Sequence, residues 1–109
     1  MDKLKNNEVI NELKKKTEPI FKKYGVEKAY VFGSYARGDY NENSDIDIII
    51  VAKNIKSLLI IGAILESLKE ALNKEVDLIE EECFDEKNVD EIDKQFFDNI
   101  KKERVIIYG

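Results

Sequence analysis

The sequence predicts an α+β (mixed α/β) fold in which helices flank a small mixed β-sheet. Short apolar runs typical of strands alternate with longer segments whose apolar residues recur every three or four positions, which is the helical period. A chain of 109 residues can form one compact core but not two independent ones. We therefore expect residues 1–109 to form a single domain.

A long helix is expected first. Its apolar stripe, which includes one threonine, consists of Ile10, Leu13, Thr17, Phe21 and Tyr24. Pro19 can kink this helix, and Gly25 can end it because glycine readily adopts the left-handed conformation found after helices. A strand over Val26 to Phe32 should follow, since valine and aromatic residues favour extended backbone.

The next segment predicts a turn, a loop and a second strand. Gly33-Ser34 ends the first strand, and Tyr35 to Gly38 is expected to form a short helical turn. Asp39 to Ser44 reads as a polar loop. Ile46 to Ala52 is apolar apart from Asp47, which is typical of a central strand covered on both faces.

The second half of the chain predicts two further helices and two further strands. Ser57 to Asn73 is expected to be an amphipathic helix, with a stripe formed by Leu58, Ile61, Leu65, Leu68 and Leu72. Glu75 to Ile79 should be a third strand. A helix from Asp90 to Lys102 is indicated by the stripe Ile92, Phe96 and Ile100. Val105 to Tyr108 is a short apolar strand.

Composition excludes several classes of chemistry. The chain has no histidine and a single cysteine, Cys83, which excludes Ser-His-Asp and Cys-His catalysis, an internal disulfide and a cysteine–histidine zinc site. We interpret Cys83 as a partly buried apolar residue. A net charge of −5 argues against binding of long nucleic acids, which needs lysines and arginines to neutralise phosphates. Any catalysis must use carboxylates, hydroxyls, backbone amides and metal ions.

No segment suits a membrane span or a secretory signal. The longest apolar run, Leu58 to Leu65, has eight residues, whereas a span needs about 20. Lys3 and Lys5 near the N-terminus are not followed by an apolar stretch or a small-residue cleavage site. We therefore expect a cytoplasmic protein that does not act at a membrane.

Gly33-Ser34 is a candidate phosphate-binding turn. It lies where a strand gives way to a helical turn, so backbone N–H groups and the serine hydroxyl can converge on phosphate oxygens. A side chain at Gly33 would hold a triphosphate away from the backbone. Gly-Ser is also a common turn sequence, and an ordinary turn without a ligand is the alternative interpretation.

Asp45 and Asp47 are candidate ligands for divalent cations. They lie two residues apart at the start of a predicted strand, whose period of two places both carboxylates on one face. Two metal ions held there can bind a triphosphate, stabilise the leaving pyrophosphate and lower the pKa of an attacking hydroxyl. Magnesium suits such oxygen ligands. A solvated pair of aspartates in a surface loop is the alternative.

Asp47 interrupts an apolar strand, and this favours the metal interpretation. An unpaired buried carboxylate is costly, so a cation is needed, from a lysine, an arginine or a metal. Asp77, between Val76 and Leu78, is a second acid within an apolar strand and could lie beside the first pair. It would then bind metal or accept the proton of the acceptor hydroxyl.

These residues together resemble a known signature. Gly33-Ser34, ten intervening residues and Asp45-Ile46-Asp47 match the pattern of the polymerase-beta-like nucleotidyltransferase superfamily. The stretch from Gly33 to Gly38, with Ser44 to Asp47, looks like its minimal nucleotidyltransferase branch. The resemblance implies the polymerase-beta-like palm fold over nearly the whole chain.

The resemblance also implies roles for individual residues. Gly33 and Ser34 would hold the triphosphate of ATP, and Asp45 and Asp47 would bind two magnesium ions. Asp77 would be the third acid of the metal and catalytic site, although Glu75 lies on the same face of the predicted strand. Arg37 matches an arginine common in the minimal branch and would contact phosphate or the acceptor. A salt bridge from Arg37 to Asp39 or to the acidic loop is the alternative.

The minimal branch resembles the antitoxin half of toxin–antitoxin pairs whose partner is an all-helical HEPN-domain ribonuclease. This resemblance implies AMPylation, the transfer of AMP from ATP to a tyrosine of that toxin. One alternative is an antitoxin that inhibits only by binding, through apolar residues such as Phe96, Phe97 and Ile107. Others are transfer to a small molecule and a metal site without turnover.

Overall fold

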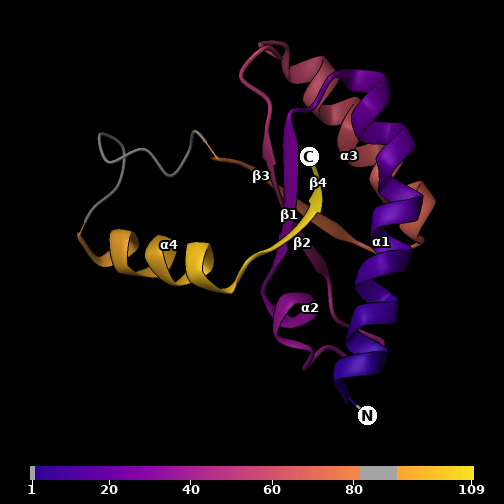
Figure 1. Ribbon diagram of the computed structural model, residues 1–109. Coiled ribbons are helices and arrows are strands. Elements are labelled where there is room, and N and C mark those ends of the chain that lie inside the picture. Colours follow the sequence, from indigo (N-terminus) through magenta and orange to yellow (C-terminus); the bar gives the residue numbers. More distant parts are fainter. Residues whose placement is uncertain (1, 82–90) are drawn as a thin grey trace.

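The computed structural model describes residues 2–81 and 91–109 of the chain (Figure 1). In chain order the elements are α1 (Asp2–Tyr24), β1 (Lys28–Phe32), α2 (Ser34–Arg37), β2 (Ile46–Val51), α3 (Leu58–Leu72), β3 (Val76–Glu80), α4 (Glu91–Glu103) and β4 (Val105–Tyr108). The four strands form one sheet in the order β3-β2-β1-β4. β2 and β3 are parallel, while β1 is antiparallel to both β2 and β4. The predicted fold class, a mixed sheet flanked by helices, is therefore confirmed.

For each helix and strand whose two ends were predicted, the observed ends lie within two residues of the predicted ones. α1 continues through Pro19 and ends before Gly25, whose φ is 75°. The amide of Val26 then donates to the Phe21 carbonyl over 3.0 Å, so Val26 closes the helix instead of opening the strand. This is why β1 begins at Lys28 and not at Val26.

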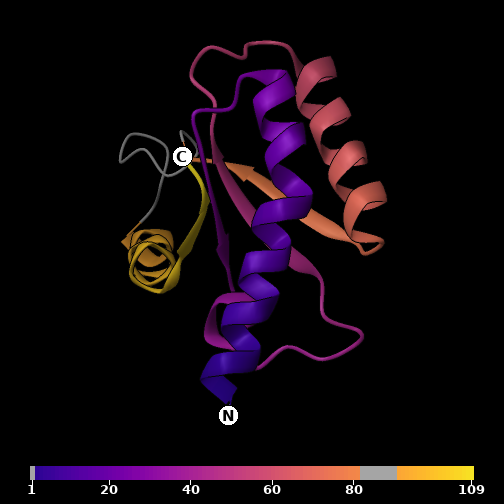
Figure 2. The ribbon, with the colours of Figure 1, turned by 45° about the vertical axis from the view of Figure 1, so that its right-hand side comes forward.

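One face of the sheet packs against α1 and α3. Ile46, Ile48 and Ile50 point to this face, and Phe21 of α1 and Leu68 of α3 are fully buried with them in the main core. Figures 1 and 2 show α1 and α3 side by side on this face and α4 on the opposite one. The main core therefore fixes the orientation of β2, because its alternate residues must all point toward the two helices.

α4 covers part of the other face. Ile100 of α4 packs against Phe32 and Ile49, and these three residues form a second buried cluster. Arg104 lies over the ring of Tyr30, at 3.9 Å from its centroid, and donates to Glu81 Oε1 over 3.0 Å. These contacts hold the C-terminal end of α4 against the sheet.

Two predictions about apolar residues were wrong. Leu58 was expected on the buried stripe of α3, but it is 85% exposed, because the helix begins there and its buried residues, Ile64 and Leu68, start almost two turns later. Ile107 was a candidate for a docking surface, but it is buried in the main core, with 4% exposure.

Other predictions of this kind cannot be compared with the structure. Cys83 and the side chains of Phe96 and Phe97 lie outside the described residues. None of the helices in the described part of the chain is long and apolar enough to cross a membrane.

Candidate active site

Two acids from neighbouring strands meet on the face of the sheet that carries α4. Asp47 in β2 lies directly beside Asp77 in β3, because the two parallel strands pair in this register. On its other side Asp47 is paired with Phe32, the last residue of β1. Asp45 immediately precedes β2, and its negative charge acts on Asp47. Alternate residues of β2 thus form two faces. One face carries the buried Ile46, Ile48 and Ile50, and the other carries Asp47.

Gly33 lies close to the Asp47 carboxylate. Its backbone has φ 72° and ψ −145°, a conformation that favours glycine. A Cβ atom at this position would lie 2.5 Å from Asp47 Oδ2, which is far inside van der Waals contact. In the sequence, the approach of a phosphate is one reason for a glycine at this position. The structure adds a second reason, the close packing of the turn against the Asp47 carboxylate.

Ser34 begins the short helix α2 directly after this turn. The amides of Ala36 and Arg37 donate to the Gly33 carbonyl over 3.1 and 3.0 Å, and the amide of Gly38 donates to the Ser34 carbonyl over 2.8 Å. The first N–H groups of any helix have no acceptor within it, so the amides at the start of α2 can bind an anion. The turn therefore places hydrogen-bond donors beside the acidic pair.

A cavity of about 720 Å³ opens at this place. It is lined by Phe32, Gly33, Arg37, Asp47, Asp77, Leu78, Ile79, Asn99, Ile100 and Glu103. Its volume lies within the range of cavities that bind small molecules. Two of the predicted site residues, Ser34 and Asp45, border the same turn and strand but are not part of this lining. Three residues of α4 that the sequence did not single out as site residues, Asn99, Ile100 and Glu103, form one wall.

The surroundings of the acidic pair disfavour the ionised form of Asp47. Burial, a hydrogen bond with the Asp77 carboxyl group, and the negative charges of Asp77 and Asp45 raise the pKa of Asp47 to about 6, and the positive charge of Arg37 opposes this effect. A nearby cation would offset the repulsion from Asp77 and Asp45 and stabilise the ionised carboxylate. The pair is thus an environment in which a divalent cation is favoured.

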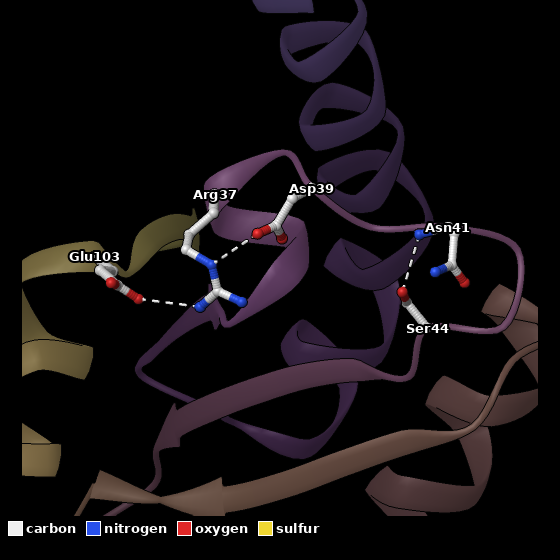
Figure 3. A network of polar contacts seen from close by, with 5 residues as sticks. All are labelled: Arg37, Asp39, Asn41, Ser44 and Glu103. Atoms are coloured by element: carbon white, nitrogen blue, oxygen red, sulfur yellow. Dashed lines mark hydrogen bonds and ion pairs between the residues drawn. The ribbon is translucent and has the colours of Figure 1, made fainter.

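Arg37 stands at the mouth of the cavity and pairs with two carboxylates. Its Nε donates to Asp39 Oδ2 over 3.2 Å and its Nη1 donates to Glu103 Oε2 over 3.4 Å (Figure 3). The salt bridge to Asp39, predicted as the alternative to a ligand contact, is therefore present. The same side chain lines the cavity with Asp47 and Asp77.

Carboxylate oxygens of the kind that magnesium prefers are concentrated here. Among the described residues, however, no group of three or more histidine, cysteine, aspartate or glutamate side chains already has the geometry of a metal site. Asp47 and Asp77 lie side by side on paired strands and form two of the three carboxylates of the candidate site. The exposed Asp45 is the third carboxylate. Glu75 pairs with Lys69 over 3.4 Å and is not part of the cavity lining, whereas Asp77 is, which favours Asp77 over Glu75 as the third acid.

The fold, the acids on adjacent strands and the glycine–serine turn together define a nucleotidyltransferase. The chain belongs to this family, because the family model described as Nucleotidyltransferase domain matches residues 8–107. A protein of Methanocaldococcus jannaschii with the provisional name protein adenylyltransferase MJ0435 is 49% identical over 70 residues, which cover 64% of this chain and 75% of that protein. Protein adenylyltransferase MntA of Thermococcus cleftensis is 42% identical over 57 residues, which cover 52% of this chain and 58% of that protein.

A solved structure described as a toxin–antitoxin with AMP-PNP has a similar fold. It matches this chain with a TM-score of 0.66 and 22% identity, over 88% of this chain and 73% of that one. At this identity the likeness establishes the fold. The family predicted from the sequence signature is confirmed by the family match and by these relatives.

Proposed function

We propose that this protein is a magnesium-dependent protein adenylyltransferase, the antitoxin of a toxin–antitoxin pair, which transfers AMP from ATP to a hydroxyl group of its partner. The observation that carries the proposal is the register that sets Asp47 beside Asp77, with Gly33 packed against Asp47 at the mouth of the cavity. The names of two relatives, both protein adenylyltransferases, and the toxin–antitoxin structure with AMP-PNP support it.

The partner we propose is an all-helical HEPN-domain toxin, and the acceptor is one of its tyrosines. The sequence resemblance to minimal nucleotidyltransferases suggests this partner. The cavity is compatible with an aromatic acceptor, since Phe32 and Ile100 give it apolar walls close to the acidic pair. An aromatic ring can pack on such walls while its hydroxyl reaches Asp77.

Different residues of the chain would have different roles in the reaction. The amides at the start of α2 and the Ser34 hydroxyl hold the triphosphate, and Arg37 neutralises part of its charge. The acceptor hydroxyl attacks the α-phosphorus in line, and the bond from this phosphorus to the bridging oxygen of pyrophosphate breaks. Asp77 takes the proton of the attacking hydroxyl. AMP is thus attached to the acceptor and pyrophosphate leaves, without a covalent enzyme intermediate.

Asp45, Asp47 and Asp77 would hold the magnesium ions. Bound there, two ions supply positive charge that offsets the repulsion among the carboxylates and stabilises charge on the phosphates. The raised pKa of Asp47 supports this assignment, because it marks a carboxylate that lacks a sufficient counter-charge.

The test is a transfer assay with the purified partner toxin, magnesium and ATP labelled on the α-phosphate. We expect label on the toxin with the wild-type protein and none with Asp47→Asn. Asp98→Asn, which changes an exposed aspartate of α4, is the matched control and should transfer normally. Absence of label from an inhibited toxin would instead favour an antitoxin that acts by binding alone.

The same assay separates the remaining alternatives. Transfer to a small molecule predicts pyrophosphate release with a small acceptor and an unmodified toxin in the mass spectrum. A metal site without turnover predicts no pyrophosphate release with any acceptor. Label on a residue other than tyrosine would leave the transferase activity standing and contradict the proposed acceptor.

A further inference from the structure

The loop between α2 and β2 ends at Asp45, so its position determines where that carboxylate lies. Asp45 is exposed and stands outside the cavity lining, whereas Asp47 and Asp77 line the cavity and are held by the pairing of β2 with β3. Asp45 precedes β2, and so strand pairing alone does not fix it. Its placement depends on the contacts of the loop before it.

The first of these contacts is an aromatic stack. The rings of Tyr35 and Tyr40 lie 4.3 Å apart, centroid to centroid, at an interplanar angle of 5°. Tyr35 is 4% exposed and belongs to the main core. Tyr40 therefore joins the start of the loop to the rigid interior of the protein, and it does so on the face of the sheet opposite the acidic pair.

The second contact joins the loop to the turn between α3 and β3. Lys74 Nζ donates to the Glu42 carbonyl over 2.8 Å, between residues 32 positions apart in the sequence. Lys74 lies between Asn73, the left-handed residue after α3, and Glu75, whose carbonyl accepts from the Ile46 amide over 3.0 Å. The segment that bonds to the loop therefore leads directly into the strand that carries Asp77.

The loop also closes on itself. The Asn41 amide donates to Ser44 Oγ over 2.9 Å, a bond drawn in Figure 3, and the Ser44 amide donates to the Asn41 carbonyl over 3.1 Å. The Asn43 amide donates to Asn41 Oδ1 over 2.8 Å. These bonds make residues 41–44 a compact unit. Movement of that unit would move Asp45 with it, and Tyr40 and Lys74 are its attachments to the core and to β3.

We propose that Lys74 and Tyr40 are positioning residues, which hold the 41–44 unit so that the Asp45 carboxylate stays within reach of a divalent cation held by Asp47 and Asp77. The inference rests on the proposed function, since it assigns these residues to the cation of that site. Neither side chain touches the cation. Lys74 acts through the Glu42 carbonyl, and Tyr40 acts through its stack on Tyr35.

The test measures the binding of Mn²⁺, a magnetic substitute for Mg²⁺, to the full chain with ATP by electron paramagnetic resonance. Lys74→Ala should weaken Mn²⁺ binding about tenfold, the lower end of what loss of a supporting contact costs a metal site. Lys74→Arg retains a donor and should restore binding to within about threefold of wild type. Lys69→Ala is the matched control, because Lys69 pairs with Glu75 and not with the loop.

A second pair of variants tests the stack. Tyr40→Phe keeps the ring and should bind Mn²⁺ as the wild type does, whereas Tyr40→Ala should weaken binding about tenfold. Amide hydrogen exchange over residues 39–46 should be faster in Lys74→Ala and Tyr40→Ala than in their conservative partners. This readout reports the attachment of the loop without using activity.

The outcomes separate the inference from the proposed function. Wild-type Mn²⁺ binding in Lys74→Ala and Tyr40→Ala, at temperatures where both are folded, would overturn the inference and leave the transferase intact. A loss of thermal stability with unchanged Mn²⁺ binding would also overturn it, because the contacts would then be merely structural. A wild-type protein that binds no Mn²⁺ with ATP and transfers no AMP would overturn both proposals.

Discussion

Replacement of Asp47 by asparagine should stabilise the protein at neutral pH in the absence of divalent cations. The pKa of Asp47 is raised from its ordinary value of 3.8 to about 6, so the folded protein binds this proton more tightly than the unfolded chain does. Stability is therefore greatest where the carboxyl group is protonated in the folded state, and it falls as the pH rises from about 4 to about 6. Above that range the full cost of the ionised carboxylate is present.

The size of this effect follows from the pKa change. A rise from 3.8 to about 6 corresponds to about 3 kcal/mol if it is taken at face value. Asp47 is only half-buried, and solvent screens part of the interaction, so we expect about 1 kcal/mol. Asparagine keeps the size of the side chain and removes the charge. The free energy of unfolding of Asp47→Asn minus that of the wild type should thus increase by about 0.7 kcal/mol between pH 4.5 and pH 7.5, because part of the change occurs below pH 4.5.

Urea unfolding with EDTA present, followed by circular dichroism across this pH range, measures the difference directly. Asp98→Asn is the control, since it changes an exposed aspartate and should follow the wild-type pH profile. A difference between Asp47→Asn and wild type that stays constant with pH, or that shrinks as pH rises, would refute the argument that repulsion and burial raise this pKa.

Three further predictions follow from the same geometry. Gly33→Ala should lower the free energy of unfolding by about 2 kcal/mol, because of its positive φ and the clash with Asp47. Gly62→Ala, whose Cβ would meet no described atom within 4 Å, should raise the free energy of unfolding by about 0.5 kcal/mol. Equal urea midpoints for Gly33→Ala and Gly62→Ala would contradict the close approach of Gly33 to Asp47. Asp45→Asn should reduce AMP transfer more than about 100-fold with an unchanged circular dichroism spectrum, whereas nearly normal transfer would remove Asp45 from the site. Arg37→Ala should raise the KM for ATP about tenfold with a smaller effect on kcat, and an unchanged KM would limit Arg37 to its ion pairs.

The acidic face could be predicted from sequence because it depends on a local rule. Alternation along a strand predicts Asp45 and Asp47 on one side, and Ile46, Ile48 and Ile50 lie on the other. The pairing of Asp47 with Asp77 needed one more step, the parallel register of β2 and β3. This register could be predicted because Asp47 and Asp77 each interrupt an apolar strand close to the first residue of that strand.

The wall contributed by α4 could not be predicted in this way. The apolar stripe of α4 indicated a helix with one buried side, but nothing local says which face of the sheet it covers. Packing of Ile100 against Phe32 and Ile49 decides that, and it brings Glu103 to Arg37 as a consequence. The exposure of Leu58 was missed for a similar reason, since periodicity does not show where a helix leaves the sheet.

The two faces of β2 explain how the protein tolerates an unfavourable carboxylate. Ile48 and Ile50 are fully buried against the main core, and Ile49 is fully buried under α4, so the middle of the strand is covered on both sides as the sequence predicts. Asp47 lies one residue before this covered segment, where its side chain lines the cavity. Burial of three isoleucines, each contributing on the order of 2 kcal/mol, exceeds the cost of about 1 kcal/mol assigned to the carboxylate. The fold can therefore keep an ionised acid at the position where a cation and a triphosphate would meet.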